Sequence, residues 1–205
     1  MINALSSQLA GAWRSASWVE ISAAALAVLY VVLAIGERRS CWAAAFVSSC
    51  LYVLVLFGAR LYMESVLNGF YAVMAVYGYR HWRAGTGETR LAICRWPLSR
   101  HAGGLLGVLV LSAASSFYLR RYTPAAWPIA DSLVAWSSVF ATFLVARKVY
   151  ENWHWWLIID ATAACLYFAR HLYPTSLLFA LYLPLIVIGM RQWRLSMRFS
   201  ADARR

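Results

Sequence analysis

One carboxylate lies inside a long apolar stretch that is also rich in tryptophan, in the run Asn152-Trp-His-Trp-Trp-Leu-Ile-Ile-Asp160. Trp153, Trp156 and Asp160 are spaced i, i+3 and i+7, which puts them on one face of an α-helix. Indole faces attract a flat cationic ring by stacking and cation–π effects, and the carboxylate adds charge and hydrogen-bond acceptors. The pattern therefore indicates a substrate-binding site for a flat, positively charged solute.

The position of Asp160 within its predicted helix favours a binding role. A charged carboxylate near the middle of a bilayer costs at least about 2.5–3.5 kcal/mol, and such residues usually face a polar interior or a substrate path. The alternative is a structural hydrogen bond to a neighbouring helix. An interfacial aromatic belt is the alternative role for the tryptophans; it suits Trp153, whereas Trp156 lies deeper. Asn152 is either a helix cap or a polar contact at the mouth of the site.

Composition indicates which elements position these side chains. Of the 205 residues, 62% are hydrophobic and 13% are charged, whereas soluble domains are about 25% charged. A membrane-spanning helix needs about 20 mostly apolar residues. Runs of this kind occupy residues 18–36, 41–59, 65–82, 102–119, 126–146, 153–171 and 174–193. We therefore expect an all-α membrane protein with seven transmembrane helices in a single membrane domain, residues 1–205.

An internal repeat organises these helices. Residues 20–83, shifted by 111, overlay residues 131–194 without a gap, and 15 of the 64 positions are identical. The most informative identities are Trp42/Trp153, Tyr71/Tyr182, Gly78/Gly189, Arg80/Arg191 and Trp82/Trp193. Duplicated membrane segments are typical of secondary transporters, in which two halves move around a central site. The repeat therefore favours transport.

The number of helices in each copy predicts how the copies are oriented. A triplet of helices is odd, so a single intervening helix is needed for the second triplet to enter the membrane in the same direction. We expect a first triplet over residues 18–83, a cytoplasmic loop over 84–101, a linking helix over 102–119 and a second triplet over 126–194. This is a 3+1+3 arrangement of parallel repeats.

The two copies differ at the candidate site. Only Trp42 in the first copy matches a tryptophan of the Trp153/Trp156 pair. We therefore expect an asymmetric pocket, built mainly by the second triplet and walled by the first. Asn68 and Tyr71 are the strongest polar candidates from that wall.

Two weaker candidates lie on the fifth predicted helix. They are Trp136 and Thr142. An isolated threonine in a membrane helix usually bonds to its own helix backbone, so Thr142 is expected to contribute less than the tyrosine and asparagine of the wall.

The basic residues exclude nucleic acid as a partner and predict an orientation. The net charge is +11, but the basic side chains lie at the ends of the predicted helices rather than clustering on a solvated surface. In the seven-helix arrangement 14 of the 19 fall on one side, and the other five are Arg14, Arg60, Arg120, Arg121 and Arg170. The positive-inside rule makes the richer side cytoplasmic. The N-terminus is then outside and the C-terminus in the cytoplasm.

Several motifs resemble one family of transporters. Residues 151–160 resemble the N-W-x-x-W-x-x-x-(N or D) signature of the Pnu vitamin transporter family, whose type member carries nicotinamide riboside. Residues 146–148, 18–20 and 77–82 extend the resemblance, which covers residues 18–194. It implies a fold like that of a full-length SWEET sugar transporter, a homotrimer in the bacterial inner membrane, and binding roles for the tryptophans and carboxylate described above.

The resemblance also implies a mode of transport. Family members take up nicotinamide riboside by facilitated diffusion, and a cytoplasmic kinase traps the vitamin as its phosphate for NAD biosynthesis. Nicotinamide riboside carriers often have Asn where this chain has Asp160, and Gln near the position of Asn68. Because related Pnu proteins transport thiamine, another aromatic cation, thiamine is an alternative substrate.

Other classes of function are weighed from the same residues. Proton-coupled symport stays open because one buried carboxylate can bind one proton; a non-transporting receptor also stays open. A retinal protein needs a lysine in its last helix, and the only lysine is Lys148. The sequence has no pair of histidines at i, i+4 and no second carboxylate predicted to be buried, so we expect no enzyme, no metal and no cofactor.

Overall fold

The computed structural model describes residues 17–58, 62–83, 91–122, 127–169 and 173–202. Within these ranges the chain forms seven α-helices and no strand longer than an isolated bridge. They are α2 (Trp18–Ile35), α3 (Ser40–Gly58), α4 (Tyr62–Arg83), α5 (Leu98–Tyr122), α6 (Pro128–Ala146), α7 (Asn152–Ala169) and α8 (Tyr173–Asp202). The all-helical prediction is confirmed.

Five of these helices, α2, α3, α5, α6 and α8, contain a window long and apolar enough to cross a membrane. The sequences of α4 and α7 are more polar, and both contribute polar side chains to the interior described below. The linking helix α5 begins four residues earlier than expected, so residues 98–101 belong to it and not to the loop. Arg14, Arg60 and Arg170, used above for the orientation, lie outside the described residues, as do Arg90, Arg204 and Arg205.

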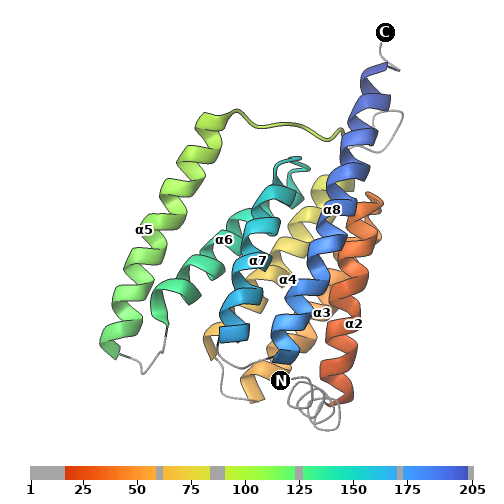
Figure 1. Cartoon of the computed structure of the whole chain (residues 1–205). Coiled ribbons are helices and arrows are strands. Elements are labelled where there is room, and N and C mark those ends of the chain that lie inside the picture. The colour runs from red at the N-terminus through yellow and green to blue at the C-terminus, as the bar shows by residue number, and fades with distance from the viewer. Residues whose placement is uncertain (1–16, 59–61, 84–90, 123–126, 170–172, 203–205) are drawn as a thin grey trace.

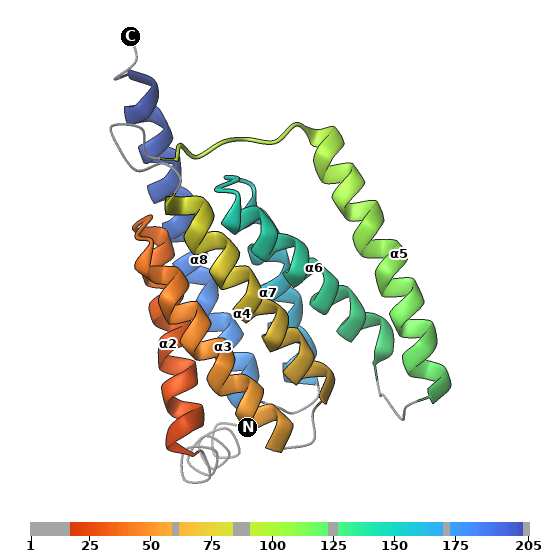
Figure 2. The same cartoon turned by 180° about the vertical axis from the view of Figure 1, so that it is seen from behind.

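Six of the helices form a closed ring. Helix α2 packs against α3, α3 against α4, α4 against α6, α6 against α7, α7 against α8, and α8 back against α2 (Figures 1 and 2). Helix α5 packs mainly against α6, on the outside of this ring, and His101 near its start accepts a hydrogen bond from Trp155 of α7. Any polar interior enclosed by the ring is therefore built without α5.

The two turns at the top of Figure 1, residues 36–39 and 147–151, lie on the same side of the ring as residues 91–97 and the end of α8. We call this side the C-terminal face. Helices α2, α4, α6 and α8 all end toward it, and α3, α5 and α7 begin there.

The same hydrogen bond recurs within each of the two copies, at equivalent positions. The Ser65 hydroxyl donates to the carbonyl of Val53 at 3.1 Å, and the Ser176 hydroxyl donates to the carbonyl of Ala164 at 2.7 Å. Both serines and both acceptors differ by 111 in number, the offset of the sequence repeat. The contacts of α4 on α3 thus recur in α8 on α7.

Two glycines of the repeat permit close packing of tryptophan. A Cβ atom added to Gly189 would lie 2.5 Å from the ring of Trp153, and one added to Gly78 would clash in the same way with the ring of Trp42. Both indoles are nearly inaccessible, with 4% and 1% exposed. The identities at these four positions are therefore explained by helix packing.

Candidate functional site

The ring of six helices encloses a cavity of about 430 Å³, a size suited to a small ligand. Each of the six helices contributes lining residues, and α5 contributes none. Six of the eight residues predicted to bind substrate line this one cavity: Asn68, Tyr71, Thr142, Trp153, Trp156 and Asp160.

Asp160 lies on the wall formed by α7 and is only 5% exposed. In the part of the chain that the structure describes, no lysine, arginine or histidine forms an ion pair with this carboxylate. A buried charge without a partner is costly unless something else satisfies it. A cation that enters the cavity can meet that need.

The two tryptophans of α7 occupy different environments. Trp153 is enclosed by Gly189 and by an edge-on contact with Trp193, whose ring centroid is 5.4 Å away. Trp156, one turn nearer to Asp160, is half-buried and more open to the cavity. Trp156 therefore presents the more accessible aromatic face, whereas Trp153 closes one end of the cavity.

The polar residues of the wall make local hydrogen bonds. The Asn68 amide donates to the carbonyl of Glu64 at 2.9 Å, and the Thr142 hydroxyl donates to the carbonyl of Ser138 at 2.8 Å. The Thr142 bond is the one expected for an isolated threonine in a membrane helix. The Asn68 carbonyl oxygen is left as the more available acceptor for a ligand.

Two predicted residues do not reach the cavity, and we leave them out of the site. Trp136 faces α5, and its indole N–H donates to the Ser115 hydroxyl at 3.1 Å. It is six positions from Thr142, so the two side chains point about 120° apart around the helix axis and lie on different faces. Asn152 is fully buried, and its amide donates to the carbonyl of Val149 at 2.6 Å, closing the turn that precedes α7.

The cavity also contains functional groups that the sequence pattern did not single out. Glu64 and Asp131 line it, each from the first turn of its helix. Helical spacing is the signal that could have revealed them: Glu64 precedes Asn68 by four residues, and Asp131 precedes Thr142 by eleven. The cavity thus contains three carboxylates, and no lysine, arginine or histidine is among its described lining residues.

Tyrosines make up much of the remaining polar lining. Tyr30, Tyr52 and Tyr182 come from three different helices, α2, α3 and α8. Each offers an aromatic face together with a hydroxyl group. With its carboxylates and its aromatic rings, the cavity is chemically suited to a flat organic cation.

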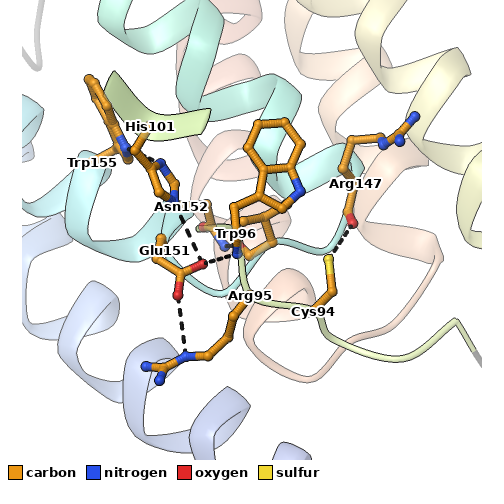
Figure 3. A network of polar contacts seen from close by, with 9 residues as sticks. Cys94, Arg95, Trp96, His101, Arg147, Glu151, Asn152 and Trp155 are labelled. Atoms are coloured by element: carbon orange, nitrogen blue, oxygen red, sulfur yellow. Dashed lines mark hydrogen bonds and ion pairs between the residues drawn. The ribbon is translucent and has the colours of Figure 1, made fainter. Parts of the chain in front are cut away.

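A polar network holds residues 91–97 against the turn before α7 (Figure 3). Glu151 accepts from the backbone N–H of Trp96 at 3.2 Å and forms an ion pair with Arg95, also at 3.2 Å. The backbone of Cys94 exchanges hydrogen bonds with Lys148 and Tyr150, at 3.0 and 2.8 Å. This segment therefore fixes the α6–α7 turn at the C-terminal face.

Glu151→Gln is expected to loosen this segment. Loss of the carboxylate charge weakens the bonds to the segment by about 1 kcal/mol, which is roughly a fivefold increase in local opening. Trypsin cleavage after Arg95 should accelerate by that factor, as measured by timed digestion and mass spectrometry. Glu20→Gln, on the opposite side of the molecule, is the control, and equal cleavage rates in the two variants would contradict the assignment.

Four of the six helices around the ligand-sized cavity, α2, α3, α6 and α8, are long and apolar enough to cross a membrane, an arrangement typical of membrane transport proteins. The sequence profile of the nicotinamide mononucleotide transporter family matches residues 17–195, and the chain belongs to this family of multi-pass membrane proteins.

Individual relatives are similar over most of their length. The riboflavin/roseoflavin transporter RibM of Streptomyces davaonensis is 28% identical over 179 residues, covering 82% of this chain and 81% of the relative. The nicotinamide riboside transporter PnuC of Escherichia coli is 24% identical over 203 residues, covering 86% and 85%. The crystal structure of the vitamin B3 transporter PnuC superimposes with a TM-score of 0.73 at 21% identity, over 96% of this chain and 89% of that one.

Proposed function

We propose that this protein carries a flat aromatic cation across the membrane, and that the cation is nicotinamide riboside. The observation that supports this most strongly is the composition of the central cavity. Asp160, Glu64 and Asp131 provide negative charge, the tryptophans and tyrosines provide aromatic faces, and the described lining has no basic side chain. The pyridinium ring of nicotinamide riboside is flat and positively charged, so both features attract it.

The same lining disfavours a phosphorylated substrate. Nicotinamide mononucleotide, after which the family is described, carries a phosphate dianion. Proteins usually bind phosphate through arginine, lysine or a helix N-terminus. Three carboxylates in the cavity repel a phosphate, so we propose that the unphosphorylated nucleoside is the transported form.

Two other substrates have specific support. Thiamine is an aromatic cation and satisfies the same physical requirements. Riboflavin is favoured by the 28% identity to RibM, but its neutral ring gains nothing from Asp160. Side-by-side binding of the three vitamins to purified protein should rank nicotinamide riboside or thiamine at least about tenfold above riboflavin. A preference for riboflavin would replace the proposal with flavin transport.

The transport cycle we propose uses the two triplets as a pair. A first triplet of α2–α4 and a second of α6–α8, linked by α5, would alternate around the cavity in a 3+1+3 arrangement. The contacts at equivalent positions and the closed six-helix ring support this organisation. We further propose a bacterial inner-membrane homotrimer with its C-terminal face in the cytoplasm.

Transport is proposed to be facilitated diffusion, with phosphorylation in the cytoplasm retaining the vitamin. In proteoliposomes, counterflow of labelled nicotinamide riboside should occur without an ion gradient. An imposed pH gradient should leave its rate unchanged, whereas a clear response would indicate proton coupling through Asp160. A receptor that does not transport would give no counterflow.

Trp156→Ala tests the aromatic part of the proposed site. Loss of an indole that stacks on the cation removes about 1–2 kcal/mol of binding free energy, so the affinity for nicotinamide riboside should fall roughly 5- to 30-fold. Trp136→Ala is the matched control, because this indole faces α5. Equal losses in the two variants, measured as the half-saturation concentration for counterflow, would place the substrate elsewhere.

A further inference from the structure

We propose that one ion pair and a row of four tryptophans form the gate of the transport pathway at the C-terminal face. The ion pair joins Glu37 and Lys148, and the four-tryptophan row consists of Trp42, Trp82, Trp193 and Trp153. The inference rests on the proposed transport function, because a gate requires a pathway. It goes further by naming the contacts that must break for the solute to leave.

The ion pair connects equivalent positions of the two copies. Lys148 Nζ lies 2.7 Å from Glu37 Oε2, and the two residues are 111 apart in number. Each occupies the turn that follows the first helix of its triplet, and each has a left-handed backbone, with φ of 53° and 51°. The pair therefore sits where the two triplets meet and face each other.

The environment of the pair makes it stronger than a surface salt bridge. The side chain of Lys148 is 6% exposed and that of Glu37 is 23% exposed. The Lys148 ammonium also lies over the ring of Trp82, 4.8 Å from its centroid. Partly buried pairs are screened less by solvent than exposed ones. Breaking this pair is consequently a significant step in any opening of the C-terminal face.

The four-tryptophan row runs from one triplet to the other. Trp42 contacts Trp82 edge-on at 5.5 Å between ring centroids, and Trp82 lies 6.3 Å from Trp193. Trp193 then contacts Trp153 edge-on at 5.4 Å. Trp42 and Trp153 also line the cavity. The row thus closes the cavity on the side of the two turns.

Two hydrogen bonds cross between the triplets within this layer. The Trp82 indole donates to the carbonyl of Ala146 at 3.1 Å, and the Trp193 indole donates to the carbonyl of Ala34 at 3.0 Å. Each bond joins the last helix of one triplet to the end of the first helix of the other. Separating the triplets on this side breaks both bonds together with the ion pair.

The closed arrangement also contains unfavourable groups, as a reversible gate requires. The indole N–H groups of Trp42 and Trp153 are buried and have no acceptor among the described residues. A buried donor without an acceptor destabilises the arrangement that buries it. This cost offsets part of the stabilisation from the crossing contacts, so the closed state is not excessively stable.

The two sides of the gate are held unequally. Residues 91–97 bond to the backbone of the α6–α7 turn. Among the described segments, none outside the α2–α3 hairpin bonds to the backbone of residues 36–39. We infer that the α2–α3 turn moves, and that the α6–α7 turn, which is bonded to residues 91–97, stays in place.

Cys41 provides a native probe of opening. It is fully buried in the cluster that contains Trp42 and Trp82. With Cys50, Cys94 and Cys165 replaced by serine, its reaction with a membrane-impermeant maleimide reports access from each face of oriented vesicles. The assay uses no substrate, so its result does not depend on which vitamin the protein carries.

We expect Glu37→Gln to raise the labelling rate of Cys41 from the C-terminal face at least about fivefold. The charge-exchanged double variant Glu37→Lys/Lys148→Glu should return the rate to near that of the parent, because it restores the pair across equivalent positions. Arg95→Gln is the control, since it breaks an ion pair in the same layer that does not join the two turns.

Three outcomes would overturn the gate. The first is a Glu37→Gln rate equal to that of the parent, and the second is a charge-exchanged variant that labels faster than Glu37→Gln. The third is a rate that rises equally from both faces with a lowered unfolding temperature, which would show that the pair supports only the fold. Counterflow measured separately on the parent tests the proposed transport function. Failure of the gate proposal and failure of the transport proposal are therefore distinguishable.

Discussion

Replacing Asp160 with Leu should lower the affinity for nicotinamide riboside roughly 30- to 150-fold. The substitution keeps the approximate size of the side chain. It removes the one charge that lies deep in the cavity and has no cationic partner among the described residues. At about 4 Å and an effective dielectric constant of about 20, a charge pair is worth roughly 4 kcal/mol. Desolvation of both groups reduces the net loss to about 2–3 kcal/mol. Isothermal titration calorimetry on purified protein measures it directly.

Controls for this result come from the substrate and from a second carboxylate. Riboflavin lacks the positive charge, so its binding should change less than about threefold in Asp160→Leu. Glu64 is exposed at the edge of the cavity, and Glu64→Gln should weaken nicotinamide riboside binding only a few-fold because solvent screens its charge. Equal losses for the neutral and the charged vitamin would show that Asp160 acts through structure and not through charge.

Gly189→Ala is expected to destabilise the protein and to abolish transport. The new Cβ would lie 2.5 Å from the indole of Trp153, a rigid ring packed edge-on against Trp193. Overpacking of this kind typically costs about 1–3 kcal/mol. To relieve it, α8 must move away from α7 or the indole must turn into the cavity. The unfolding temperature in detergent and the counterflow rate should both fall.

A second glycine provides a control with the same chemical change. Gly69, in α4, has no atom within 4 Å of an added Cβ, so Gly69→Ala should leave stability and counterflow unchanged. Gly78→Ala, which meets Trp42, should resemble Gly189→Ala because the two sites are related by the repeat. Wild-type stability in Gly189→Ala would contradict the close packing that we infer for this pair.

Helical spacing predicts the part of the site whose residues lie on a single helix. Trp153, Trp156 and Asp160 share a face of α7, and the structure places that face on the cavity. The same rule could have excluded Trp136, which lies on a different face from Thr142.

Other features depended on contacts between distant segments. Glu64 and Asp131 looked like ordinary first-turn acids, and only the packing of α4 against α6 brings both into one cavity. The buried position of Asn152 depends on the tight turn that closes on Val149. The repeat shows that Glu37 and Lys148 are equivalent positions. That they form an ion pair could not be predicted without knowing that the two copies face each other.

The most direct test of the account is a structure of the protein with nicotinamide riboside bound. The pyridinium ring should lie inside the six-helix ring, against the face of Trp156, with its positive charge toward the Asp160 carboxylate. A ligand bound outside that cavity would contradict the central claim. So would a ligand bound within the cavity with its ribose, and not its pyridinium ring, against Trp156 and with the Asp160 carboxylate turned away from it.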